Sequence, residues 1–426
     1  MNAFQKYEAY KPSGVEWIGE IPEHWEPKPG FTVIEERKEK NKGLKENTVL
    51  SLSYGNVIVK SEEKQTGLVP ESFETYQLVY PGDIIVRPTD LQNDKTSLRT
   101  GLARDKGIIT SAYINLKMTN GYSTGFFHYF LHSIDVTKVI YGLGSGLRQN
   151  LDFGDFKRFV FLVPPLSEQT RIAHFLDQKT AQIDQAIAQK ERLIELLKER
   201  RQILIQNAVT RGLDPNVKMK DSGVEWIGEV PEHWEVTKAK FYSNIFVPER
   251  AKPELNTEND GTPWVTTDLL RNNELFQADV TYYVSEIAKR KARSRIITAK
   301  SVIATCVGNF GISSKLNFDC IVNQQIQGFT DLRINADYLT YLIGISEAYF
   351  KNNATLTTIM YVSKDTFGCM PILLPNEDEQ FEIVNHIATI AQKIATAIAC
   401  KQAEIEKLKE YKATLINSAV TGKIKV

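Results

Sequence analysis

The chain has 426 residues, of which 42% are hydrophobic and 10% aromatic, and its 52 basic residues are balanced by 52 acidic ones. This length suits two to four domains, each with enough apolar side chains for a core. Zero net charge argues against a protein that binds nucleic acid tightly and non-specifically on its own, since such proteins are normally basic. The sequence shows no membrane-length apolar run and no signal-peptide core, so we expect a cytoplasmic protein with no membrane partner.

The N-terminal segment, residues 1–26, ends in a motif that the chain repeats. Residues 13–26 return as residues 222–235 with 13 of the 14 positions identical. Each copy contains two tryptophans, which could in principle stack on bases. Residues that read different targets should differ between the copies, so we interpret these tryptophans as structural or partner-docking residues: Trp17, Trp25, Trp226 and Trp234. The chain stops about where a third copy would begin, so we expect the N-terminal segment to pack with the C-terminal region.

A variable stretch follows each copy of the motif, at residues 27–163 and 236–374. The two stretches have nearly the same length, but their sequences have diverged. Short apolar runs separated by turn residues predict a mixed α/β domain in each. The expected strands lie at 48–52, 83–86, 107–109, 301–304 and 320–322, and the expected helices at 126–131 and 338–342. We expect the strand at 83–86 to correspond to the strand at 301–304, and the strand at 107–109 to correspond to the strand at 320–322.

A long helical segment closes each half, at residues 164–212 and 375–426, and residues 213–235 form a linker with the second motif. Apolar residues recur in both segments at spacings of three and four, which is typical of a coiled-coil seam. At 1.5 Å per residue each helix would be roughly 65 Å long, so we expect an intramolecular antiparallel pair with a globular domain at each end. The alternative is that each helix packs on its own domain.

Two lysines interrupt the apolar seam of the helices. Residues 164–210 match residues 375–421 without a gap, which places Lys190 and Lys401 at equivalent positions. Because a buried lysine is costly, we expect both to mark the register of the pair or a place where the seam opens. The predicted fold is therefore α+β, with two mixed α/β domains joined by two long helices that form an antiparallel intramolecular coiled coil with pseudo-twofold symmetry.

The sequence contains no recognisable catalytic motif. It has no Gly-x-x-x-x-Gly-Lys-Ser/Thr loop, so nothing suggests ATP use, and the glycine-rich run at 142–146 lacks the setting of a dinucleotide site. No Asn/Asp-Pro-Pro-Tyr/Phe box of the amino-methyltransferases is present. His128 and His132 are four apart on a predicted helix, but no neighbouring cysteine or carboxylate completes a metal site, so we interpret them as packing residues. We expect no catalytic residue, no metal and no cofactor on this chain.

The order of motif, variable domain and long helix, repeated twice, resembles the specificity (S) subunit of Type I restriction–modification systems. The run Pro-Pro-Leu-Ser-Glu-Gln-Thr-Arg-Ile at 164–172 supports the resemblance, which covers the whole chain. It implies a non-catalytic subunit in which each variable domain is a target recognition domain that reads one half of an asymmetric, bipartite site in double-stranded DNA. The coiled coil would set the spacing between the half-sites.

The resemblance also implies partners for the conserved regions. Two methyltransferase subunits would dock there, and motor-nuclease subunits would join them in a complex that defends the cell against foreign DNA. S-adenosylmethionine and ATP would bind only to those partners. The docking candidates are the four tryptophans and the Glu-Gln pairs at the helix starts: Glu168, Gln169, Glu379 and Gln380.

Candidate DNA-binding residues lie in loops where the two variable domains differ. Arginine and lysine pair with guanine, and asparagine and glutamine pair with adenine. The first domain offers Arg87, Thr89, Gln92, Asn93, Lys95 and Arg148, and the second offers Asn309, Ser313, Lys315, Asn323, Gln324 and Gln325. A cation cluster suited to phosphate contact contains Lys289, Arg290, Lys291 and Arg293. Ordinary solvated loops and a solvated helix face would look similar.

Two other classes of function stay open from the sequence. The first is a scaffold without a role on DNA, in which two protein-binding domains sit on a coiled-coil strut. The second is an enzyme with an unrecognised site, such as a standalone methyltransferase. The divergence of the paired domains favours the specificity subunit over the scaffold, and the absent motifs disfavour the enzyme.

Overall fold

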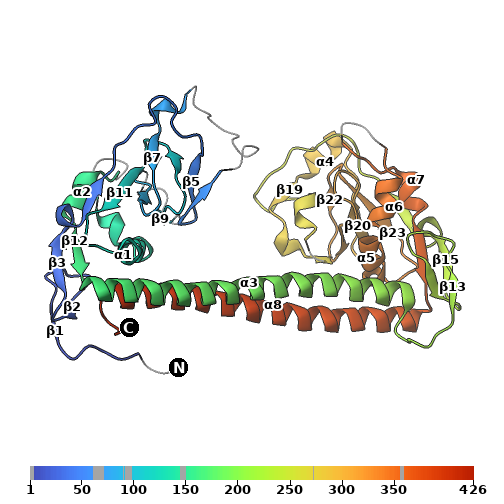
Figure 1. The fold of residues 1–426 in the computed structure, drawn as a ribbon. Helices are drawn as coiled ribbons and strands as arrows, with labels where there is room; N and C mark the ends of the chain where they lie inside the picture. Colours follow the sequence, from blue (N-terminus) through green and yellow to red (C-terminus); the bar gives the residue numbers. More distant parts are fainter. Residues whose placement is uncertain are drawn as a thin grey trace. The chain divides into compact units, whose positions relative to one another are not determined.

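The computed structural model describes residues 4–60, 72–89, 91, 98–143, 150–271, 273–355 and 359–426 (Figure 1). The chain forms two compact units. Unit 1 comprises Met1–Glu191 and Lys401–Val426, and unit 2 comprises Arg192–Cys400. The candidates Gln92, Asn93, Lys95 and Arg148 lie outside the described residues.

Unit 1 opens with the repeated motif and continues into a mainly antiparallel domain. The motif forms a hairpin of β1 (Tyr10–Pro12) and β2 (Glu20–Pro22), and β3 (Glu26–Pro29) pairs with β12 (Val160–Val163). The main sheet has the order β4-β11-β8-β9. Its strands are β4 (Ile34–Glu36), β11 (Ile114–Met118), β8 (Ile84–Val86) and β9 (Thr100–Leu102). Two further pairs are β5 (Leu50–Ser53) with β6 (Asn56–Val59), and β7 (Gln77–Val79) with β10 (Gly107–Ile109).

Helix α1 (Thr124–Val136) joins this sheet to the long helices. Its phenylalanines Phe126, Phe127 and Phe130 are fully buried in one core that also contains Ile84 of β8 and Leu176 of the first long helix. The Ser123 hydroxyl caps the helix by accepting a hydrogen bond from the Phe126 amide. The short helix α2 (Phe153–Arg158) precedes β12. A helix is therefore confirmed at the expected residues 126–131.

Unit 2 repeats this plan with additions. Its motif hairpin is β13 (Met219–Asp221) with β14 (Glu229–Pro231), and β15 (Glu235–Lys238) pairs with β24 (Pro371–Leu374). The main sheet has the order β16-β23-β20-β21-β18, and a smaller sheet has the order β19-β17-β22. The strands are β16 (Asn244–Phe246), β17 (Thr262–Val265), β18 (Glu274–Leu275), β19 (Tyr282–Val284), β20 (Val302–Thr305), β21 (Ser313–Leu316), β22 (Ile321–Val322) and β23 (Ile326–Thr330). The helices are α4 (Glu286–Ala292), α5 (Ala336–Ile345), α6 (Glu347–Asn352) and α7 (Lys364–Gly368).

The expected correspondence of strands between the two variable domains is confirmed. β8 lies between β11 and β9, and β20 lies between β23 and β21 at the same place in its sheet. β10 forms a parallel bridge with Val49 through Ile108, and β22 pairs in parallel with β17. The two domains therefore share a framework although their sequences have diverged.

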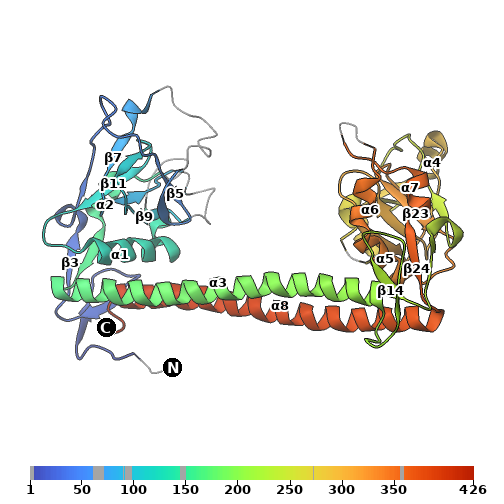
Figure 2. The ribbon, with the colours of Figure 1, turned by 45° about the vertical axis from the view of Figure 1, so that its right-hand side comes forward.

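The long helices are α3 (Leu166–Arg211) and α8 (Glu377–Val420). In unit 1, Lys190 of α3 pairs with Glu404 of α8, and Asp184 of α3 lies 2.7 Å from Lys412 of α8. An earlier residue of α3 therefore contacts a later residue of α8. In unit 2, Ala208 and Val209 of α3 share a core with Ile383 and Ile387 of α8. Both sets of contacts show antiparallel pairing, which confirms the predicted coiled coil. Figures 1 and 2 show α3 and α8 side by side.

The two seam lysines share one carboxylate. Lys190 bonds to Oε2 of Glu404, and Nζ of Lys401 lies 2.7 Å from Oε1 of the same residue. Both lysine side chains are partly exposed, which limits the cost of placing charge in the seam. The repeat offset puts Leu193 of α3 where α8 has Glu404, so the duplicated helices differ at this polar contact.

The C-terminus lies beside the N-terminal motif in unit 1, as expected. The Lys425 amide donates to the Gln5 carbonyl at 2.8 Å, and Nζ of Lys423 donates to the Ile18 carbonyl at 2.9 Å. Gly422, which ends α8 with a φ of 72°, packs closely on Pro22 and Trp25. A side chain at Gly422 would meet Pro22, so this tight approach requires glycine.

By length and composition α8 is also apolar enough to cross a membrane. One such helix is weak evidence for a membrane span, because a core helix of a soluble protein has the same composition. Its buried residues Ile387, Leu415 and Ile416 belong to the apolar cores of the two units.

Candidate functional site

The repeated motif is anchored to the start of each long helix through a glutamate. In unit 2, Trp234 is 1% exposed and donates a hydrogen bond from Nε1 to Oε1 of Glu379 at 3.0 Å. Nε2 of His233 lies 3.0 Å from the other carboxylate oxygen. In unit 1, Nε2 of His24 lies 2.8 Å from Oε2 of Glu168 in the same way. Glu168 and Glu379 therefore bind the motif of their own unit.

Glu168 and Glu379 differ in their second side-chain partner. In unit 1 the Tyr7 hydroxyl donates to Oε1 of Glu168, and burial, with this hydrogen bond, raises the pKa of Tyr7. Trp25 is fully buried, but its Nε1 has no hydrogen-bond partner in the part of the chain that the structure describes. The N-terminal tyrosine thus takes the position at the carboxylate that the tryptophan holds in unit 2. Tyr7 lies outside the repeated motif, so the repeat did not single it out.

Gln169 and Gln380 fix each variable domain to its long helix. The Gln169 side chain donates to the Pro164 carbonyl at 2.8 Å and accepts from the Ser123 amide, at the start of α1, at 2.9 Å. The Gln380 side chain donates to the Pro375 carbonyl at 2.9 Å and accepts from the Asn335 amide, at the start of α5, at 2.9 Å. Each glutamine therefore sets the position of the domain's main helix on the coiled coil.

Replacing Gln169 with alanine should destabilise the chain by about 1–3 kcal/mol, because a buried amide and a buried carbonyl lose their partners. The exposed Gln185 of α3 is a matched control, and Gln185→Ala should change the free energy of unfolding by less than about 0.5 kcal/mol. Urea denaturation of both variants measures the difference. Equal stability of the two variants would show that the Gln169 bridge contributes nothing.

Most of the docking candidates are thus buried against, or hydrogen-bonded to, other residues of this chain. Trp25, Trp234, Gln169 and Gln380 are buried, and Trp17 is partly buried, with its ring stacked 6.2 Å from that of Phe159. Trp226 is also partly buried. The motif nevertheless presents the same exposed carboxylates in both copies: Glu16, Glu20 and Glu23 in unit 1, and Glu225, Glu229 and Glu232 in unit 2. A partner that touches the motif directly meets these acidic residues.

In unit 2, one loop cluster gathers four of the DNA-binding candidates: Asn309, Asn323, Gln324 and Gln325. The Cys306 amide donates to the Gln325 carbonyl at 2.8 Å, which joins the loop after β20 to the turn before β23. Asn309, Gln324 and Gln325 are exposed on these segments. The side-chain amide of Gln324 donates through Nε2 to the Arg250 carbonyl at 2.9 Å. Polar side chains that suit base edges therefore lie together at this edge of the domain.

Within this cluster the candidates have different surroundings. Asn323 is half-buried, and its Oδ1 accepts from the Gln325 amide at 3.1 Å, so this side chain shapes the turn. The side chains of Asn309 and Gln325 have no hydrogen-bond partner among the described residues. These two are consequently the best placed to hydrogen-bond to another molecule.

Ser313 and Lys315 lie elsewhere, on β21 against α5. The Ser313 hydroxyl donates to the Thr340 carbonyl at 3.3 Å. Nζ of Lys315 lies 2.7 Å from Asp337 and also bonds to Glu274. Burial lowers the pKa of Lys315, but the two carboxylates outweigh that effect and raise it. Both side chains therefore bind β21 to its own domain.

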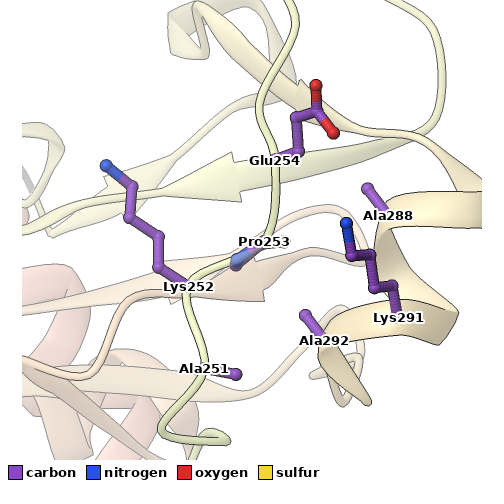
Figure 3. Close-up of a pocket in the computed structure, with 7 residues that line it drawn as sticks. All are labelled: Ala251, Lys252, Pro253, Glu254, Ala288, Lys291 and Ala292. Atoms are coloured by element: carbon purple, nitrogen blue, oxygen red, sulfur yellow. The ribbon is translucent and has the colours of Figure 1, made fainter.

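The predicted cation cluster falls on α4 and its end. Lys289 is paired with Glu286 one turn away, whereas Arg290, Lys291 and Arg293 are exposed. Arg293 ends the helix with a φ of 54°. A pocket of about 410 Å³ separates α4 from residues 251–254, and Figure 3 shows Lys291 on its helix side and Lys252 on the other segment. The exposed cations suit contact with phosphate groups.

In unit 1 a buried arginine that sequence reasoning missed holds the loop after β8. Arg99 is fully buried, and its Nη1 donates to the Thr89 carbonyl at 2.6 Å and its Nε to the Tyr141 hydroxyl at 3.2 Å. The candidates Arg87 and Thr89 belong to this loop, where Arg87 is half-buried and Thr89 is exposed. Nothing in the local sequence distinguishes Arg99 from a solvated arginine.

Comparisons with known proteins agree with this architecture. A model of the Type I restriction modification DNA specificity domain matches residues 102–196 and 231–408. The chain is 25% identical to the Type I restriction enzyme MjaVIII specificity subunit of Methanocaldococcus jannaschii, over 75% of each chain. It is 21% identical to the putative MjaX specificity subunit of the same organism, over 99% of this chain and 98% of that one.

A similar fold occurs in a solved structure that concerns complex assembly and conformational transition of the type I R-M system. The TM-score is 0.71, at 14% sequence identity, and the match covers 94% of this chain and 98% of the other. At this identity the likeness shows the fold alone.

Proposed function

Since the chain belongs to the family of Type I restriction–modification specificity subunits, we propose that it gives such a complex its DNA sequence specificity. Each variable domain reads one half of an asymmetric, bipartite site. Specificity subunits are not themselves catalytic, so the chemistry belongs to partner subunits. S-adenosylmethionine and ATP are accordingly proposed to bind only to those partners.

The observation that carries this proposal is a conserved framework around different surfaces. The main sheets share their strand order, and Gln169 and Gln380 make the same bridges. The exposed loops differ, with Asn309 and Gln325 in unit 2 but Thr89 in unit 1. Equal frameworks position the domains in the same way, and unequal loops let them recognise different bases.

The conserved parts suit two copies of one partner. The two motifs expose equivalent carboxylates, Glu16 and Glu225 among them, on backbones held by the same histidine–glutamate contact. We propose that one methyltransferase subunit docks at each motif through a basic surface. Motor-nuclease subunits join through these subunits in the restriction complex.

The long helices are proposed to set the spacing of the two half-sites. α3 has 46 residues and α8 has 44, and neither contains glycine or proline. A continuous helix pair has a fixed rise per residue, so its length defines a distance more strictly than a flexible linker does.

Co-expression with a Type I methyltransferase subunit from the same organism tests the proposal. We expect a stable complex that transfers methyl groups from S-adenosylmethionine to DNA containing a bipartite site and not to a scrambled duplex. A complex that forms but neither binds nor methylates DNA would favour the scaffold. Methyl transfer by the chain alone would favour a standalone enzyme.

A further inference from the structure

Unit 1 contains a cationic pocket that the proposed base readout does not use. Its volume is about 460 Å³, and it lies between helix α1, the turn joining β5 to β6, and the paired ends of α3 and α8. Figure 2 shows α1 lying along α3 in this unit. The lining includes Arg104, His128, His132, Lys409 and Lys412.

Positive charge exceeds negative charge on the pocket wall. Three lining residues are cations, and Asp184 is the one carboxylate among the lining residues. Lys412 and Asp184 neutralise each other, because Nζ of Lys412 lies 2.7 Å from both oxygens of Asp184. Lys409 is paired with Glu406 of the same helix at 2.9 Å. Arg104 is exposed, and no carboxylate lies within ion-pair distance of it in the described part of the chain. An uncompensated guanidinium in a concave site favours an anion.

The two histidines add polar nitrogen atoms without adding charge. Burial lowers the pKa of His128 to about 3, with further lowering by His132 and Arg104. Burial and the Lys412 cation lower the pKa of His132 to about 4. Nδ1 of His128 is buried and has no hydrogen-bond partner among the described residues. An unpaired buried nitrogen is costly, and a phosphate oxygen could accept a hydrogen bond from the tautomer of His128 that carries its proton on Nδ1.

The second unit retains only part of this arrangement. The repeat offset places Lys198 and Arg201 of α3 where α8 has Lys409 and Lys412. Alignment of α1 with α5 at their caps places Thr340 and Gly344 where α1 has the two histidines. The helix cations are thus common to both units, whereas the histidine pair belongs to unit 1.

We propose that this pocket binds a phosphate group, with Arg104 supplying the charge and the two histidines supplying polar contacts. The source is the backbone of the bound DNA or a free phosphate. Tyr54, which is 90% exposed at the mouth of the pocket, favours DNA, because aromatic side chains beside cations are common at nucleic-acid surfaces. The DNA source rests on the proposed function, but the phosphate chemistry does not.

Arg104→Gln removes the unpaired cation, and Lys117→Gln is a matched control, because Lys117 is exposed on β11 and lies outside the pocket. The first measurement is DNA binding by the complex with its methyltransferase subunits across a series of salt concentrations. Loss of one phosphate contact should reduce the slope of log K against log salt by about 0.9 for Arg104→Gln. The control should keep the slope of the unmodified complex.

The second measurement follows the histidine ring protons of the full chain by NMR while inorganic phosphate is added. The chain has six histidines, and His128→Asn and His132→Asn identify the two signals. Saturable shifts of those signals that Arg104→Gln abolishes, with an unchanged DNA slope, assign the site to a free phosphate. A reduced DNA slope assigns it to the DNA backbone.

The proposal is overturned if neither the DNA slope nor the two histidine signals respond to Arg104→Gln. Failure of the unmodified complex to bind any DNA would instead contradict the proposed function. In that case the NMR measurement still decides whether the pocket takes phosphate.

Discussion

Deleting one heptad from each long helix should shorten the spacer of the recognised DNA site by about 3 base pairs. Seven residues correspond to about 10 Å of helix, and B-DNA rises by about 3.4 Å per base pair. Matched deletions at residues 193–199 of α3 and 396–402 of α8 preserve the apolar repeat, and they leave Lys190 and Glu404 in the chain. The original site should lose its methylation, while sites with the shorter spacer gain it.

Methylation of a library of duplexes that differ only in spacer length measures this effect. Deletion of four residues from each helix is the control, because it rotates the apolar seam and should abolish methylation at every spacer. If the heptad variant kept the original spacer, the helices would not set the distance between half-sites.

Replacing Gln325 with alanine should relax recognition at one base of a single half-site. The side chain is exposed on the loop cluster of unit 2 and makes no hydrogen bond within the described chain, so it has both donors and an acceptor for a base edge. Loss of such a contact costs about 1–3 kcal/mol, which corresponds to roughly 5- to 150-fold in methylation of the cognate site. The other half-site should be read as before.

Gln402 is a matched control, since it is exposed on α8 and lies outside both variable domains. Asn323→Ala and Gln324→Ala should also affect this half-site alone, but both remove contacts that shape the loops and so should lower stability as well. Methylation of duplexes with each half-site varied separately distinguishes these effects. Equal loss at both half-sites in a folded Gln325→Ala complex would show that the loop cluster does not read bases.

The sequence predicted the parts of this structure that depend on periodicity and repetition. Alternating spacings of three and four predict the coiled-coil seam, and the two long segments, one in each half, predict an antiparallel pair. The register lysines were also identified, but their shared partner was not. Glu404 has no counterpart in α3, where Leu193 stands at the equivalent position, so repetition gives no sign of it.

Side-chain roles that depend on tertiary contacts were harder to predict. The Glu-Gln pairs at the helix starts were recognised as significant, yet the structure shows that Gln169 and Gln380 bridge to the variable domains of this chain. Lys315 and Arg99 look like surface cations in the sequence, but one bonds to two carboxylates and the other is buried against backbone carbonyls. Burial and partner identity arise from residues distant in the chain, which a local pattern does not contain.

Methylome sequencing of cells with and without this chain tests the account most directly. We predict that the chain adds methylation at one asymmetric motif, made of two different short sequences separated by a spacer of fixed length. The motif should disappear when the chain is removed. An unchanged methylome in cells that contain the assembled methyltransferase complex, or a motif of one continuous sequence, would contradict the account.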